Sequence, residues 1–164
     1  MVSYFLRYNA SKRDTVPTAC HNDRKSHTGC TLHIGKDSGS VLSLSKKQTM
    51  ITADSSTVAE LIAAHTVAKE IMWARNFLSE LKFQQINPTT LFEDNKSCIT
   101  IIMKDGNGNR SKHIDLRYHM LRELVTNGII NVLHLPGLEM TSDLLTKSTG
   151  PNVFNHLVPK LMGN

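Results

Sequence analysis

Cysteine and long apolar runs are scarce in this sequence, and each shortage excludes a class of protein. The chain has three cysteines in 164 residues and no C-x-x-C pair, which argues against a disulfide framework and fits reduced thiols. No apolar run approaches the roughly 20 residues that a membrane-spanning helix needs. The first residues, MVSYFLRYNASKR, hold no apolar stretch of signal-peptide length. We therefore expect a cytoplasmic or nuclear protein that is not secreted and has no membrane partner.

The chain does contain an excess of basic residues and enough apolar residues for one core. Nineteen Lys and Arg against fourteen Asp and Glu leave a net charge of +5, which permits a polyanionic partner without requiring one. Apolar residues make up 40% of the sequence, and a chain of this length can bury roughly 68–70% of the surface that it exposes when unfolded. These values predict one globular domain.

Hydrophobic periodicity predicts strands first and then alternating helices and strands. The predicted strands are 2–8, 27–35, 40–45, 89–94 and 129–135, and the predicted helices are 55–83, 96–104, 114–126 and 152–162. On the long helix, we expect Met72, Trp73 and Phe77 to lie in the core. This order of elements predicts an α/β domain, with a mixed sheet and helices on its faces.

Three acidic residues, Glu60, Asp94 and Asp143, fall at the boundaries of predicted elements. Each could serve its helix alone: Glu60 in a capping box with Thr57, Asp94 as an N-cap, and Asp143 against the helix dipole. Their joint placement favours a second interpretation, because strand ends and helix starts of an α/β sheet converge on one crevice. Carboxylates crowded there suit Mg²⁺ or Mn²⁺, which prefer oxygen ligands.

Five motifs in one order carry a resemblance to a known family. They are DRKSHTG (23–29), SSTVAEL (55–61), FEDNKS (92–97), RSKHIDLRYHMLRELV (110–125) and SDLLTK (142–147). Together they resemble the ribonuclease H domain at the end of the polyprotein of copia-type retrotransposons. The resemblance implies a ribonuclease H-like fold, a five-stranded mixed sheet flanked by helices. It would occupy residues 23–164 of a single domain, after a divergent segment, 1–22, that contains the first strand.

The resemblance also implies an activity: hydrolysis of the RNA strand of RNA–DNA hybrids by an endonuclease that holds two Mg²⁺ or Mn²⁺ ions. Matched motif by motif, Glu60, Asp94 and Asp143 are three of the four catalytic and metal-binding acids. The fourth belongs on the first strand. Counting back without a gap from the DRKS turn selects Asp14, whereas the stronger strand pattern puts the neutral Asn9 in its place. Activity depends on which residue occupies that position.

Further residues are candidates for holding the substrate. Basic groups that would contact phosphates without sequence preference are Arg24, Lys25, Lys112, His113 and Arg117. Hydrogen-bonding groups beside the proposed acids are Ser55, Ser56, Thr57 and Asn95, which could bind the backbone or the 2′-hydroxyls that distinguish RNA from DNA. Helix capping is the competing interpretation for the hydroxyl residues.

Three functions follow from the sequence. The first is an active ribonuclease specific for hybrids, and the second is a decayed copy that binds nucleic acid without cutting it. The third is a structural domain that docks against a reverse transcriptase domain of the parent polyprotein. The residue on the first strand separates the first function from the second, and an exposed apolar patch near the N-terminus would favour the third.

Overall fold

A five-stranded mixed sheet, in the order β3-β2-β1-β4-β5, forms the centre of the computed structural model. The structure describes residues 6–12, 27–35, 38–48, 56–104, 112–146 and 148–163, with the side chains of 6–12, 56 and 112–115 excepted. The strands are β1 (Leu6–Lys12), β2 (His27–Ile34), β3 (Ser40–Lys47), β4 (Thr89–Glu93) and β5 (Ile130–His134). The predicted mixed sheet is confirmed. Of the predicted strand 2–8, residues 6–8 lie in β1, which continues to Lys12, and residues 2–5 lie outside the described residues.

The register of the central strand fixes which strand ends meet. β1 pairs antiparallel with β2 and parallel with β4, and β4 pairs parallel with β5. The carboxyl ends of β1, β4 and β5 therefore lie at one edge of the sheet, which is where α/β folds gather their functional groups. Within this register, Asn9 of β1 is opposite Thr31 of β2 and beside Phe92 of β4.

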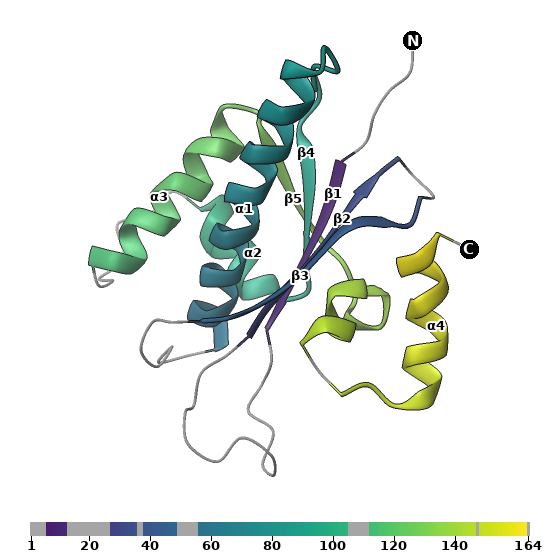
Figure 1. Cartoon of the computed structure of the whole chain (residues 1–164). Coiled ribbons are helices and arrows are strands. Elements are labelled where there is room, and N and C mark those ends of the chain that lie inside the picture. The colour runs from purple at the N-terminus through teal and green to yellow at the C-terminus, as the bar shows by residue number, and fades with distance from the viewer. Residues whose placement is uncertain are drawn as a thin grey trace.

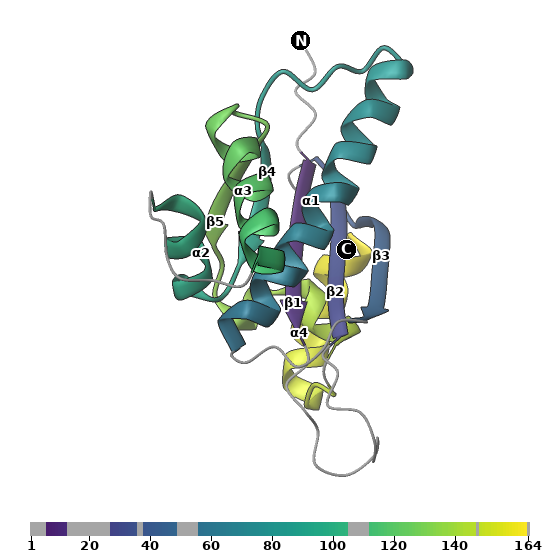
Figure 2. The ribbon, with the colours of Figure 1, turned by 90° about the vertical axis from the view of Figure 1, so that its left-hand side faces the viewer.

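Helices cover both faces of the sheet, and Figures 1 and 2 show the two layers. One face carries α1 (Ser56–Glu80), α2 (Lys96–Met103) and α3 (Lys112–Thr126), and the other carries the 3₁₀ turns η1 (Gly137–Glu139) and η2 (Thr141–Leu145) and helix α4 (Pro151–Met162). None of the described helices combines the length and the apolar character that crossing a membrane requires.

The main core lies between the sheet and α1 and α3. α1 contributes Leu61, Val67 and Ile71, which are buried together with Leu91 of β4 and Leu121 of α3. Each such side chain contributes roughly 1.5–3 kcal/mol when it is fully buried. Small residues of α1 also belong to this surface and let the helix approach the sheet closely: Ala63, Ala64, Ala68 and Ala74.

The prediction that Trp73 and Phe77 lie in the core is wrong. Their side chains are 57% and 48% exposed, and their rings stack on each other with centroids 5.6 Å apart. The buried side of α1 is formed largely by alanines, which give a weak hydrophobic signal. The larger apolar residues therefore predicted that the wrong side of the helix faces the core. The 25 residues of α1 also extend about 37 Å, beyond the strands that they cover.

The end of α3 is set by the Asn127-Gly128 pair, as predicted. Gly128 adopts a positive φ of 66°, and the N–H of Ile129 donates to the carbonyl of Leu124 over 2.9 Å. This is a Schellman ending, for which glycine has no steric penalty. It reverses the chain directly into β5.

The turn η2 is held against the sheet by close packing on β2, and this contact can be tested. A Cβ atom on Gly29 would lie 2.5 Å from Cγ2 of Thr146 and 2.8 Å from the carbonyl oxygen of Ser142. We expect Gly29→Ala to lower the free energy of unfolding by about 1–3 kcal/mol, the usual cost of overpacking. Chemical denaturation measures this. The matched control is Gly150→Ala, because a Cβ there has nothing within 4 Å; equal effects of the two changes would contradict the packing.

Candidate metal centre

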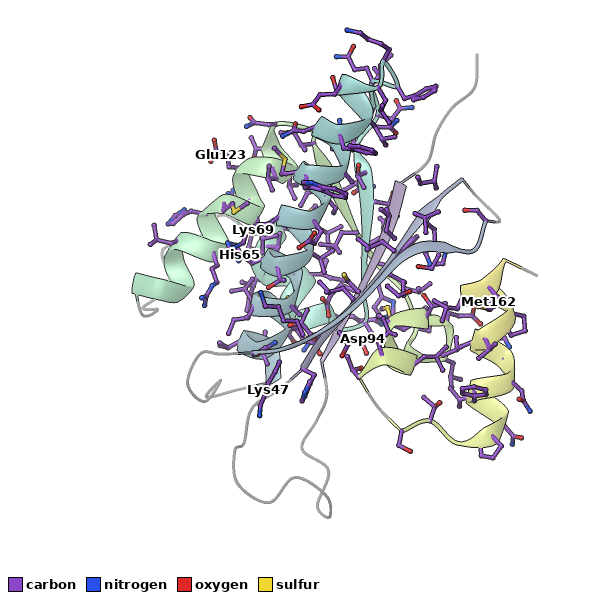
Figure 3. All side chains as sticks on the ribbon, in the orientation of Figure 1. Lys47, His65, Lys69, Asp94, Glu123 and Met162 are labelled. Atoms are coloured by element: carbon purple, nitrogen blue, oxygen red, sulfur yellow. The ribbon has the colours of Figure 1, made fainter. Side chains whose placement is uncertain are left out.

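Three carboxylates meet where the start of α1 approaches the end of β4. Glu60 lies in the second turn of α1, Glu93 is the last residue of β4, and Asp94 follows it. One oxygen from each lies within 4.8 Å of the others, and we call these three residues the acidic cluster. Figure 3 shows Asp94 at the edge of the sheet where β4 gives way to α2. The sequence predicted Glu60 and Asp94 as partners, and the structure brings them together.

The local sequence after β4 fixes this arrangement. Strand alternation buries Leu91 and Glu93 on the face that packs against α1. The side-chain oxygen of Asn95 accepts hydrogen bonds from the N–H groups of Ser97 and Cys98, which caps α2. The N–H of Asn95 in turn donates to Oε1 of Glu93 over 3.1 Å. The turn between β4 and α2 thereby holds the Glu93 side chain in place.

The capping interpretations of two acids are wrong. Asn95, not Asp94, is the N-cap of α2. α1 begins at Ser56, so Thr57 is already inside the helix and Glu60 lies beyond its first turn, where it is only 4% exposed. Helix capping therefore does not explain the positions of Glu60 and Asp94.

Burial and crowding change the protonation of the cluster. Burial raises the pKa of the Glu93 carboxyl to about 9, and the negative charges of Glu60 and Asp94 add to the rise, while the N–H of Asn95 opposes it. A protonated Glu93 can share its proton with Asp94, which acts in the same direction. Burial and the same three carboxylates also raise the pKa of the Cys98 thiol, which stays protonated. The site is one of high negative potential, suited to a cation.

Asp143 lies in η2, on the opposite face of the sheet from α1. Its side chain is 8% exposed, and the hydroxyls of Thr141 and Thr31 share a 2.8 Å hydrogen bond that ties the turn to β2. Within the described ranges, Asp143 is not part of the acidic cluster. The turn before it, η1, does lie beside the acidic cluster, because a Cβ on Gly137 would lie 3.7 Å from Oδ2 of Asp94.

The remaining predicted residues differ in what the structure describes of them. Outside the described residues lie Asp14, Arg24, Lys25 and Ser55. Only the backbone is described for Asn9, Ser56, Lys112 and His113, the last two at the start of α3. Thr57 and Arg117 are half-buried. Arg117 of α3 lies near His65 of α1: burial, with the charges of Lys69 and then Arg117, lowers the pKa of His65 to about 4.

Comparisons with known proteins identify relatives of this chain and solved structures that share its fold. No family model matches the chain. It is 36% identical over 142 residues to the retrovirus-related Pol polyprotein from transposon TNT 1-94 of Nicotiana tabacum, a match that covers 87% of this chain and 10% of the relative. LC11-RNase H1, isolated from compost, superposes with a TM-score of 0.61 at 11% identity, covering 87% of this chain and 92% of that chain. The same protein in complex with an RNA/DNA hybrid gives 0.60 at 10% identity, covering 86% and 93%.

The chain is a ribonuclease H-fold homologue of copia-type transposon Pol polyproteins. The resemblance found in the five sequence motifs is thereby confirmed, as is the predicted fold class. The part of the chain that matches this Pol polyprotein spans about a tenth of the polyprotein's length.

In this ribonuclease H fold, sequence reasoning missed Glu93 as a member of the site. The signal was present in TTLFED, because Glu93 shares the strand parity of Leu91 and so faces the apolar side of the strand. An acidic residue at a core-facing position of a buried strand is costly unless it is paired or binds an ion.

The raised pKa of Glu93 predicts how stability depends on pH without metal. A raised pKa favours the folded state only while the carboxyl is protonated, so this contribution is complete below the ordinary value of 4.5 and is lost as the pH rises toward about 9. Glutamine stays neutral. In EDTA, we expect Glu93→Gln to become increasingly more stable than the parent from pH 5 to 9, as measured by denaturation. The exposed control Glu123→Gln should follow the parent, and a Glu93→Gln curve parallel to the parent would contradict the assignment.

Proposed function

We propose that this chain is a metal-dependent endonuclease that hydrolyses the RNA strand of RNA–DNA hybrids, as part of a retrotransposon polyprotein. The observation that carries the proposal is the acidic cluster at the carboxyl edge of parallel strands in a ribonuclease H fold. A buried group of carboxylates at that edge suits a phosphodiesterase better than a purely structural domain, which gains nothing from like charges in contact.

The residues present fit divalent ions. Glu60 and Asp94 supply oxygen ligands within 4.8 Å of each other, and carboxylates are the ligands that Mg²⁺ and Mn²⁺ prefer. We assign Asp143, from the opposite face of the sheet, to the same centre. Two such ions held by these carboxylates would supply activation of a water molecule and stabilisation of the leaving oxygen of a phosphodiester. The chain's own contribution is to hold these carboxylates in a buried, fixed arrangement.

The proposed substrate is a nucleic-acid hybrid. Support comes from the net charge of +5, from the half-buried Arg117 on α3, and from the structural neighbour that was solved with an RNA/DNA hybrid. We assign phosphate contacts to Arg117 and to Lys112 and His113 at the start of α3. Such contacts are independent of sequence, and the affinity would fall steeply with salt.

The assignment of the acids predicts the loss of cleavage in two conservative variants. We expect Glu60→Gln and Asp94→Asn to cut a labelled RNA–DNA hybrid in Mg²⁺ at least about 100-fold more slowly, because groups that merely support a ligand already cost up to that much. Circular dichroism should show the fold unchanged. The control Glu123→Gln changes a carboxyl on α3 that is exposed and distant from Asp94 (Figure 3), and it should cut like the parent. Full activity in either cluster variant would contradict the proposal.

The acid of the first strand is tested by a pair of changes. Asp14 is our fourth ligand from the sequence, and Asn9 is the alternative, now on β1 beside Phe92. If Asp14 is the ligand, Asp14→Asn abolishes cleavage and Asn9→Asp has little effect. If Asn9 occupies the position, Asp14→Asn is silent and Asn9→Asp raises the cleavage rate, because a carboxylate binds the ions more tightly than an amide. Rates of hybrid cleavage in Mg²⁺ distinguish the two cases, and our assignment to Asp14 fails in the second.

Two other roles remain as outcomes of these assays. Salt-sensitive binding of the hybrid without cleavage would identify a decayed domain that only holds nucleic acid. Docking against a reverse transcriptase domain of the parent polyprotein also stays a prediction. The apolar patch that would favour it was expected near the N-terminus, where residues 1–5 lie outside the described residues. The exposed, stacked rings of Trp73 and Phe77 near the far end of α1 form a separate apolar surface.

A further inference from the structure

We propose that Glu93 is an additional carboxylate ligand of the divalent ion held by Glu60 and Asp94. The inference rests on the proposed function, because it concerns the same centre, and it adds a residue that neither the motifs nor the resemblance assigned. It makes the last residue of β4 and the residue that follows it two consecutive ligands.

The geometry of the Glu93 side chain carries this inference. Glu93 is fully buried, and its ligand oxygen lies within 4.8 Å of those of Glu60 and Asp94. Oε1 accepts the N–H of Asn95, whereas no N–H or O–H group of the described residues donates to the buried Oε2 when Glu93 is ionised. A buried carboxylate oxygen without a donor is costly. An ion at the cluster would satisfy it.

The composition of the neighbouring strand supports the same conclusion. The described span of β1, LRYNASK, contains no carboxylate, although β1 is one of the two strands that pair with β4. A centre with few carboxylates binds a hard divalent cation weakly. A carboxylate from Glu93, on the side of β4 that faces α1, adds a negative ligand without requiring one from that span of β1.

The test measures metal binding directly. Isothermal titration of Mn²⁺ into the metal-free parent, Glu93→Gln and Glu123→Gln compares affinities without any nucleic acid. Glutamine keeps an oxygen to accept the N–H of Asn95 and removes only the charge. We expect Glu93→Gln to bind Mn²⁺ roughly 10–100-fold more weakly than the parent, the range seen when groups around a metal are removed. Glu123→Gln should bind like the parent. Should Glu93→Gln not fold, Glu93→Met, which fills the buried site without an oxygen, replaces it.

The outcomes separate this inference from the proposed function. Unchanged Mn²⁺ affinity in Glu93→Gln, with affinity lost in Glu60→Gln, would overturn the role of Glu93 and leave the metal centre standing. Weakened Mn²⁺ binding in Glu93→Gln, with no cleavage of hybrids by the parent, would support Glu93 as a ligand and refute the nuclease. Absence of Mn²⁺ binding by the parent would overturn the role of Glu93.

Discussion

Repulsion among three carboxylates, held together at one edge of the sheet, is the constraint on which the site depends. Two unit charges 4.8 Å apart, the limit for these oxygens, repel by roughly 3–4 kcal/mol at an effective dielectric constant of about 20. The protein maintains this arrangement because Glu60 and Glu93 project from a helix and a strand whose other residues form the main core. Protonation of Glu93 relieves the repulsion in the metal-free protein, and a divalent ion would relieve it without a proton.

Two layers of the fold meet at this edge of the sheet. Parallel pairing of β1, β4 and β5 aligns their carboxyl ends, α1 begins beside them on one face, and η1 and η2 lie on the other (Figure 1). Close packing of η2 on Gly29, together with the bond between Thr31 and Thr141, positions the segment that carries Asp143. The stability of the second layer is thus coupled to the geometry of the proposed centre.

Much of this could be predicted from the sequence, and the failures have physical causes. Strand alternation, helical periodicity and the Asn127-Gly128 stop predicted the order and type of the elements, and the motifs selected Glu60 and Asp94. The inward orientation of Glu93 was not predicted, because an acidic residue next to Asp94 is expected to face solvent. Only the alternation of side chains along the strand, which puts Glu93 on the same face as Leu91, indicates that it points inward. The exposure of Trp73 and Phe77 could not be derived from apolar spacing, because alanines define the buried stripe of α1. Which residue supplies the first acid depends on an insertion that spacing alone does not locate.

The most direct test of the account is a crystal structure with Mn²⁺, in which anomalous scattering locates the ion independently of any activity. The account predicts an anomalous peak between the carboxylates of Glu60, Glu93 and Asp94, with oxygen atoms of Glu60 and Asp94 in its coordination sphere. A peak only at other sites, or none at a concentration that saturates binding in solution, would contradict it.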